Sequence, residues 1–304
     1  MALGLAGSAT VRAAMRDVAL DESLYSLDEE ESAFFKSQTG IEDDEALKSH
    51  ILRVQKEAYE VWPFPCIRRF SFTKLKISRL PAYPQLVTLG RHRPGAILLD
   101  LGTCFGNDVR KAVADGFPAH NTIGSDIEPA FWRLGHELFK STPETFPSTF
   151  IAGDVFNSAF LETRQPLKAV PEGPTPALGT LASLNPLHGR VSAIHTSAFF
   201  HLFEESNQHE LARAVAGLLS PEPGSLILGV HVAAPEKGVR RSEGSDKPFE
   251  IFCHSPESWT EMWDNIFEPG TVKVETELKE MANGAQRTGI NMRIWEMAWS
   301  VTRL

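Results

Sequence analysis

Cysteine is scarce in this sequence, and the positions of the cysteines argue against a small domain stabilised by disulfides and against one stabilised by zinc. The 304 residues include three cysteines, Cys66, Cys104 and Cys253, and none of them belongs to a C-x-x-C pair. An odd number of widely separated cysteines suits neither a disulfide framework nor a zinc site. The run FCHSPE also offers too few ligands for a metal ion. We therefore expect reduced thiols and no bound metal.

Long apolar runs and an excess of positive charge are also lacking. No stretch approaches the roughly 20 apolar residues of a membrane helix, and Arg12 and Arg16 interrupt the apolar start, which argues against a signal peptide. Lysine and arginine number 30 against 39 acidic residues, and the resulting net charge of −9 would repel a phosphate backbone. We expect a soluble, cytoplasmic protein with no membrane insertion and no nucleic-acid partner. A G-x-S-x-G motif is missing too, which disfavours a serine hydrolase.

The first part of the chain carries a helical pattern. In residues 42–62 the apolar residues recur at spacings of four and three, after a cluster of acidic residues: Leu47, Ile51, Val54, Ala58 and Val61. Such a stripe indicates a helix with one buried face, and acids at its start suit the helix dipole. Pro63 and Pro65 end it. We predict an N-terminal helical cap or lid over residues 1–90 and a second domain over residues 91–304.

From residue 96 onward, strand patterns alternate with helix patterns. Strands are predicted at 96–102, 121–127, 149–156, 191–200 and 224–232, and helices at 105–116, 129–140 and 205–220. This alternation indicates an α/β fold in which helices cover a parallel sheet. A helix capped by Ser255 is expected at 255–267, strands at 271–278 and 291–304, and a short helix near 177–184. We expect the basic stretch 239–247 to be solvated surface, and the NG dipeptide at 283–284 to lie in the last connection.

A carboxylate and two glycines stand where the first predicted strand ends. The order is Asp100-x-Gly102-x-x-x-Gly106, whereas a dinucleotide fold has G-x-G-x-x-G. Glycine allows the sharp turn from strand to helix and lets a ligand approach the backbone. An acid at this turn would oppose a pyrophosphate but attract a cationic amino group. The spacing therefore favours S-adenosylmethionine (SAM), which has an amino group, a sulfonium and no phosphate, over NAD.

Two further acids end the next two predicted strands. Asp126 closes the second strand, where a carboxylate can accept both ribose hydroxyls, and Asp154 closes the third, where it could bond an adenine amine. Either could instead be a helix cap or a turn residue, but three acids at successive strand ends favour a ligand. We place Thr103 of the glycine loop, and Ile127 and Val155 beside the two acids, in the same predicted cofactor site.

The fourth predicted strand runs into HTSAFFHLF and brings His195 and His201 to the same edge of the sheet. A histidine there could orient a nucleophile or take its proton, and it could equally be a packed core residue. Phe131 and Trp132 we assign to the core by default. The aromatics near residues 62–72 and 199–203, with Trp259 and Trp263, could form an acceptor pocket. Arg68 or Arg69 could pair with an acceptor carboxylate.

The same segments resemble a known family. AILLDLGTCFGNDVRKAVADG, GSDI, FIAGDVF, HTSAFFHLF and HSPESWTEMW are similar to the fungal secondary-metabolite methyltransferases of the class I SAM superfamily, in particular those of meroterpenoid pathways. The resemblance implies a Rossmann-like seven-stranded sheet with a reversed final strand, an N-terminal helical cap and a small-molecule acceptor. It also implies that Asp100, Gly102 and Gly106 face the methionine part of SAM, Asp126 the ribose and Asp154 the adenine. Cys104 stands where a middle glycine is common.

The predicted activity is methyl transfer from SAM to an oxygen of an apolar natural product, with S-adenosylhomocysteine (SAH) as the second product. In meroterpenoid relatives the acceptor is often a carboxyl group, so we expect a methyl ester. A carboxylate needs no general base, whereas a phenol would, with His201 or His195 as the candidate. Phenolic O-methylation, C-methylation, a SAM-binding regulatory protein and an NAD enzyme stay open as alternatives, and so does a homodimer.

Overall fold

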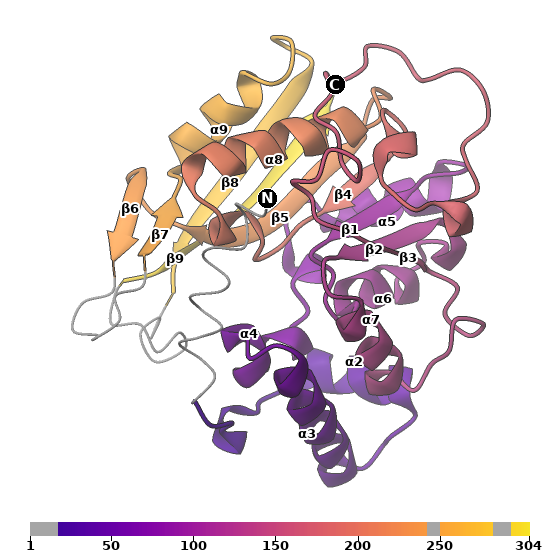
Figure 1. The fold of residues 1–304 in the computed structure, drawn as a ribbon, viewed down its shortest axis with the longest axis vertical. Coiled ribbons are helices and arrows are strands. Elements are labelled where there is room, and N and C mark those ends of the chain that lie inside the picture. Colours follow the sequence, from indigo (N-terminus) through magenta and orange to yellow (C-terminus); the bar gives the residue numbers. More distant parts are fainter. Residues whose placement is uncertain (1–17, 242–249, 282–292) are drawn as a thin grey trace.

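A seven-stranded sheet forms the centre of the computed structural model, which describes residues 18–241, 250–281 and 293–304 (Figure 1). The strand order is β3-β2-β1-β4-β5-β9-β8. The strands are β1 (Leu98–Leu101), β2 (Thr122–Asp126), β3 (Thr149–Ala152), β4 (Ala193–His195), β5 (Leu226–Ala233), β8 (Val272–Glu280) and β9 (Trp295–Arg303). Strands β1 to β5 are parallel, and β9 is antiparallel to both of its neighbours. The predicted α/β class and the reversed final strand are thus confirmed.

Helices cover both faces of this sheet because its central strands are buried on both sides. Leu99 and Leu101 pack with α8 (Glu205–Leu218) and α9 (Pro256–Asp264). Leu98, one residue out of phase, packs with α5 (Tyr83–His92) and α6 (Asn107–Ala114) on the opposite face. Successive side chains of a strand point to opposite faces, so a run of apolar residues requires cover on each. Ser255 accepts the Ser258 backbone N–H as the predicted cap of α9.

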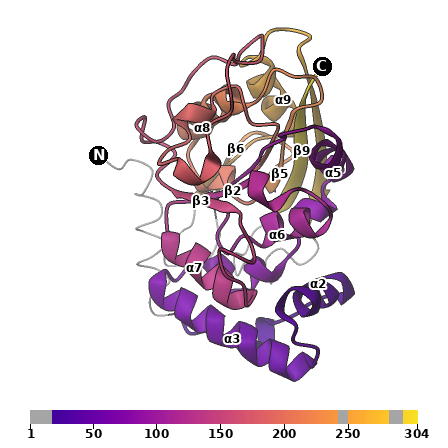
Figure 2. The same cartoon turned by 90° about the vertical axis from the view of Figure 1, so that its right-hand side faces the viewer.

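Three of the described helices form the N-terminal cap, which Figures 1 and 2 show gathered at one end of the molecule. They are α2 (Glu29–Thr39), α3 (Asp44–Val61) and α4 (Pro65–Arg68). The predicted stripe of α3 packs mainly inward, with Leu47, Ile51, Val54 and Ala58 buried and Val61 partly buried. It shares one apolar cluster with Phe105 of the glycine loop and with α7 (Pro129–Leu138). The cap therefore rests directly on the loop that follows β1.

Helix α5 lies at the predicted boundary between the N-terminal cap and the second domain. It spans Tyr83–His92, across the predicted boundary at residue 90, and its Leu86 and Leu89 pack beside Leu98 of the sheet. The division at residue 90 remains a prediction. Residues 1–17 of the predicted cap and the NG dipeptide at 283–284 lie outside the described residues.

Two sequence-based expectations differ from the structure. The predicted helix near 177–184 is a single 3-10 turn, Leu178–Thr180, because the surrounding proline and glycine residues leave no room for regular hydrogen bonding. The basic stretch 239–247, expected to be solvated surface, begins within β6 (Gly238–Arg241), which forms an unpredicted antiparallel pair with β7 (Glu250–Cys253). Residues 242–247 of that stretch lie outside the described residues. Arg241 is nevertheless exposed, as expected. Among the described residues, no helix is long and apolar enough to cross a membrane.

Candidate functional site

The loop from Gly102 to Gly106 turns the chain from β1 into α6 through three left-handed residues. Gly102, Cys104 and Gly106 have φ of 71°, 51° and 73°. A Cβ at Gly102 would lie 2.7 Å from the Phe199 ring, and a Cβ at Gly106 would lie 2.7 Å from the Trp132 ring. Both glycines are therefore required by torsion and by space. Cys104 adopts the left-handed torsion without being glycine, which costs about 1–2 kcal/mol.

Asp100, the third of the four residues of β1, has both carboxylate oxygens engaged. Thr103 donates its hydroxyl to Oδ2 at 2.6 Å, and the His195 Nδ1 lies 2.7 Å from Oδ1. Parallel pairing of β1 with β4 sets Asp100 directly opposite His195, and both side chains are buried. The carboxylate holds the glycine loop through Thr103 and the end of β4 through His195.

The chain of hydrogen bonds continues from His195 to Val230 in β5. Its Nε2 lies 2.7 Å from the Ser197 Oγ, which also accepts the Val230 backbone N–H at 3.2 Å. Burial lowers the pKa of His195, but the charge and hydrogen bond of Asp100 outweigh burial and leave the pKa raised. Both ring nitrogens of His195 are therefore engaged within the protein, and its catalytic role remains a prediction.

Asp126, the last residue of β2, joins the glycine loop to the start of α7. Its Oδ2 accepts the Cys104 backbone N–H at 2.9 Å, and its Oδ1 accepts that of Glu128 at 3.0 Å. Burial raises the pKa of this partly exposed carboxyl, and the backbone donors oppose the rise. The next residue, Ile127, is 49% exposed, so an apolar side chain stands uncovered beside the carboxylate.

Asp154 follows β3 in a tight turn in which its Oδ1 accepts the Phe156 backbone N–H at 3.0 Å. The side chains of Asp154 and Val155 are both partly buried, and Val155 packs against the main core. The Gly153 N–H donates to the Asp126 carbonyl at 3.0 Å, which links the ends of β2 and β3. The three acids therefore stand at one edge of three neighbouring strands, as the sequence predicts. Their contacts with a cofactor remain predictions.

His201 lies in a 3-10 turn, Phe200–Leu202, just after β4. Its Nδ1 accepts the Val232 backbone N–H at 3.4 Å, and burial lowers the pKa of the ring to about 4. The imidazole is therefore neutral at pH 7, with its proton on Nε2. A group of this pKa is a weak base for an acceptor such as a phenol.

The expectation that Trp259 and Trp263 line an acceptor pocket is wrong. Both side chains are 0% exposed and pack edge-on against Phe200 in the main core. Their indole rings also contact Trp299. Aromatic residues suit a pocket and a core equally. Trp259 and Trp263 lie on the inward face of α9, and they therefore belong to the core. Phe131 and Trp132 are core residues, as the default assignment predicted.

The two adjacent arginines of the cap have different surroundings. The Arg68 guanidinium donates to the Ala19 carbonyl at 2.8 Å and lies 3.9 Å from Asp21. Arg69 has no side-chain partner within the described part of the chain, and desolvation lowers the pKa of its guanidinium. The sequence offered no means of separating them.

All three cysteines are free thiols. Cys66 of α4 is exposed to solvent as a residue. Its thiol is nevertheless desolvated by the protein atoms around it, and this desolvation raises the pKa of the thiol. The charges of Lys76 and Asp126 also act on that thiol. Within residues 18–241, 250–281 and 293–304, no cluster of histidine, cysteine and acidic side chains could hold a metal ion.

The sheet is mostly parallel with a reversed last strand, and an acid and two glycines form the loop after β1. Together these features define the Rossmann-like fold of class I SAM-dependent methyltransferases. Comparison with known proteins narrows the class. A family model described as the meroterpenoid methyltransferase N-terminal domain matches residues 20–73. That segment contains α2, α3 and α4 of the cap.

Three relatives extend the match into the sheet domain. The asnovolin E/chermesin D methyltransferase nvfJ of Aspergillus novofumigatus is 34% identical over 71% of this chain and 69% of its own. Methyltransferase ausD of Penicillium brasilianum is 31% identical over 84% and 83%. O-methyltransferase atr3 of Stereocaulon alpinum is 32% identical over 72% and 57%. The chain belongs to this family of SAM-dependent methyltransferases of fungal secondary metabolism, as the sequence motifs indicated.

Membership in this family sets aside the NAD alternative, because its members transfer methyl groups. Among solved structures, a SAM-dependent methyltransferase from Mesorhizobium loti is 14% identical over 74% of this chain and 99% of its own, with a TM-score of 0.41. That structural likeness is loose.

Proposed function

We propose that the protein transfers the methyl group of SAM to a carboxylate oxygen of a small apolar natural product, giving a methyl ester and SAH. The carboxylate oxygen attacks the methyl carbon, the carbon–sulfur bond breaks with its electron pair going to sulfur, and no proton is released. The protein's contribution is to align the two reactants and exclude water, because the sulfonium is already reactive.

The hydrogen bonds of His195 and the lowered pKa of His201, at the end of β4 and just after it, support this proposal. His195 has both nitrogens engaged, and the pKa of His201 is lowered to about 4. A carboxylic acid with a pKa near ~4 is ionised at pH 7 and needs no base, whereas a phenol with a pKa near ~10 does. His201 is a weak base and both nitrogens of His195 are engaged, so this position favours the carboxylate as acceptor.

We assign SAM to the residues identified from the sequence: Asp100, Gly102, Thr103, Gly106, Asp126, Ile127, Asp154 and Val155. The left-handed glycine loop offers close approach to the methionyl part, as the torsions at Gly102 and Gly106 support. Asp126 would accept the ribose hydroxyls, and the exposed face of Ile127 suits a flat adenine ring. Asp154 would bond the adenine amine.

Two alternatives remain within this family: methylation of a phenol and methylation of carbon. The name of the relative atr3, an O-methyltransferase, supports transfer to oxygen. A SAM-binding protein that only regulates a partner would show affinity for SAH without turnover.

Incubation with SAM labelled in its methyl group, together with terpenoid acids and matched phenols, tests the proposal. We expect label in the acids only, and mild alkaline hydrolysis should release it as methanol, because esters saponify whereas aryl ethers and C-methyl groups do not. Label that survives this treatment, or label in the phenols alone, would contradict esterification.

Arg69 is our candidate partner for the acceptor carboxylate, since its guanidinium lacks a partner among the described residues. We expect Arg69→Gln to raise KM for an acid acceptor by about tenfold, the effect of one lost charge-assisted hydrogen bond. Steady-state kinetics would measure it. The matched control is Arg68→Gln, which makes the same charge change at a residue bonded to Ala19. Equal KM values in the two variants would remove Arg69 from this role.

A further inference from the structure

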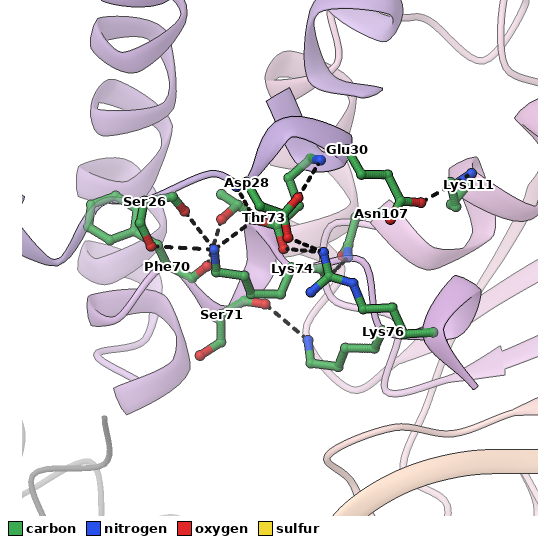
Figure 3. Close-up of polar contacts among 12 residues, drawn as sticks. Ser26, Asp28, Glu30, Phe70, Ser71, Thr73, Lys74, Lys76, Asn107 and Lys111 are labelled. Atoms are coloured by element: carbon green, nitrogen blue, oxygen red, sulfur yellow. Dashed lines mark hydrogen bonds and ion pairs between the residues drawn. The ribbon is translucent and has the colours of Figure 1, made fainter. Parts of the chain in front are cut away.

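A charged cluster fastens the cap to α6, and Figure 3 shows most of its members. The buried carboxylate of Glu31 accepts from Lys74 at 2.8 Å and from Arg79 at 3.1 Å, and Arg79 also pairs with Asp28. Lys111 of α6 lies 3.8 Å from the Glu30 carboxylate of α2 and 2.7 Å from the Asp115 carboxylate. Each of these three cations thus has a carboxylate partner, which a charge needs when it is partly buried, as Lys74 and Lys111 are.

Lys76 is the exception in this cluster. Its Nζ donates to the Ser71 carbonyl at 3.0 Å, toward which the side chain extends in Figure 3. Within the described residues no carboxylate lies at ion-pair distance from it, although its side chain is partly buried. An ammonium group has three donors. Only the contact with Ser71 engages one of them among the described residues, which leaves two for an anionic ligand.

The backbone at Lys76 is held beside the glycine loop. The N–H groups of Lys76 and Ile77 both donate to Asp108 Oδ1 at 2.9 Å, and Asn107 donates to the Lys74 carbonyl at 3.0 Å. Asn107 and Asp108 are the first residues of α6 and directly follow Gly106. These bonds hold Lys76 next to the loop that we assign to the methionyl part of SAM.

The charge of Lys76 acts on groups around that loop. It opposes the rise in the pKa of the Cys104 thiol in the loop and of the His195 ring, which is bonded to Asp100. Burial remains the main cause of the raised pKa of Cys104. The ammonium group is therefore close enough to the loop to matter electrostatically.

The methionyl part of SAM carries an ammonium and a carboxylate. The assigned site supplies acids, Asp100, Asp126 and Asp154, but none of these can neutralise the ligand carboxylate. We propose that Lys76 binds the methionyl carboxylate of SAM and of SAH. This assignment rests on the proposed function, because it requires the methionyl part to lie against the glycine loop.

Isothermal titration with SAH and with its decarboxylated analogue, in which hydrogen replaces the carboxylate, tests the proposal. We expect Lys76→Met to weaken SAH binding by about tenfold, the scale of one charge-assisted hydrogen bond, and to change the affinity for the analogue by less than about twofold. Lys76→Arg should restore most of the SAH affinity. Lys56→Met, at an exposed position of α3, is the control for loss of a cap lysine.

Each other outcome overturns the proposal in a different way. Unchanged SAH affinity in Lys76→Met would show that the lysine makes no contact with the ligand. Equal weakening toward both ligands, accompanied by a lower melting temperature, would show that it supports only the cap. Failure of the wild-type protein to bind SAH would remove the cofactor assignment itself, and the role of Lys76 with it.

Discussion

Replacing Asp126 with alanine is expected to weaken SAH binding by about a hundredfold. In the proposed site this carboxylate accepts two ribose hydroxyls, and each hydrogen bond to a charged group is worth about 1.5 kcal/mol or more. The change also frees the Cys104 N–H, which Asp126 holds at 2.9 Å, and so loosens a loop that is already strained at Cys104. Isothermal titration of SAH would measure the loss.

Glu128→Ala is the matched control for this prediction, since it removes one negative charge only two residues away. Glu128 caps α7 by accepting the Ala130 N–H at 2.9 Å, so its loss should cost stability of about 1 kcal/mol and leave SAH affinity within about twofold. If the two variants lose affinity equally, the effect is one of general charge or folding, and Asp126 has no ribose role.

The sequence was sufficient to predict those features of the fold that depend on a local pattern of residues. The stripe Leu47, Ile51, Val54 and Ala58 predicted α3 because spacings of three and four report one buried helix face. The glycine loop was predictable because an apolar strand that ends in an acid and two glycines is typical of a sharp strand-to-helix turn. Strand β6 could not be found in this way, because its sequence GVRR has a single apolar side chain, Val239, and so gives no apolar pattern.

Features that depend on distant partners could not be predicted. Asp100 and His195 were each recognised, but their hydrogen bond exists because β4 crosses over to pair beside β1 in register. Trp259 was misassigned because its type fits a pocket and a core equally. Lys74 and Lys76 look alike in the sequence, and only the position of Glu31 shows which of them has a carboxylate partner.

The buried pair of Asp100 and His195 makes a second large prediction, which concerns stability. Asp100→Asn leaves His195 buried without a charged partner, which should lower the free energy of unfolding at pH 6 by about 3 kcal/mol. The pKa of His195 is raised in the folded protein. Wild-type stability from this pair is therefore fully present below the unfolded pKa of about 6.5, and it is lost as the pH rises through the folded pKa.

The variant should show the opposite dependence on pH. Without Asp100 the largest remaining effect on His195 is burial, which lowers the pKa of the ring; the charge of Asp108 raises that pKa and the charge of Lys76 lowers it. Asp100→Asn should therefore lose stability as the pH falls below about 6.5. Urea unfolding at pH 6 and at pH 9 would measure both proteins, and the gap between them should narrow at the higher pH. Adding His195→Gln to either protein should abolish the change of its stability with pH, because this substitution removes the titrating group. A gap of constant size across this range would mean that the ring does not ionise, and that Asp100 and His195 share only a neutral hydrogen bond.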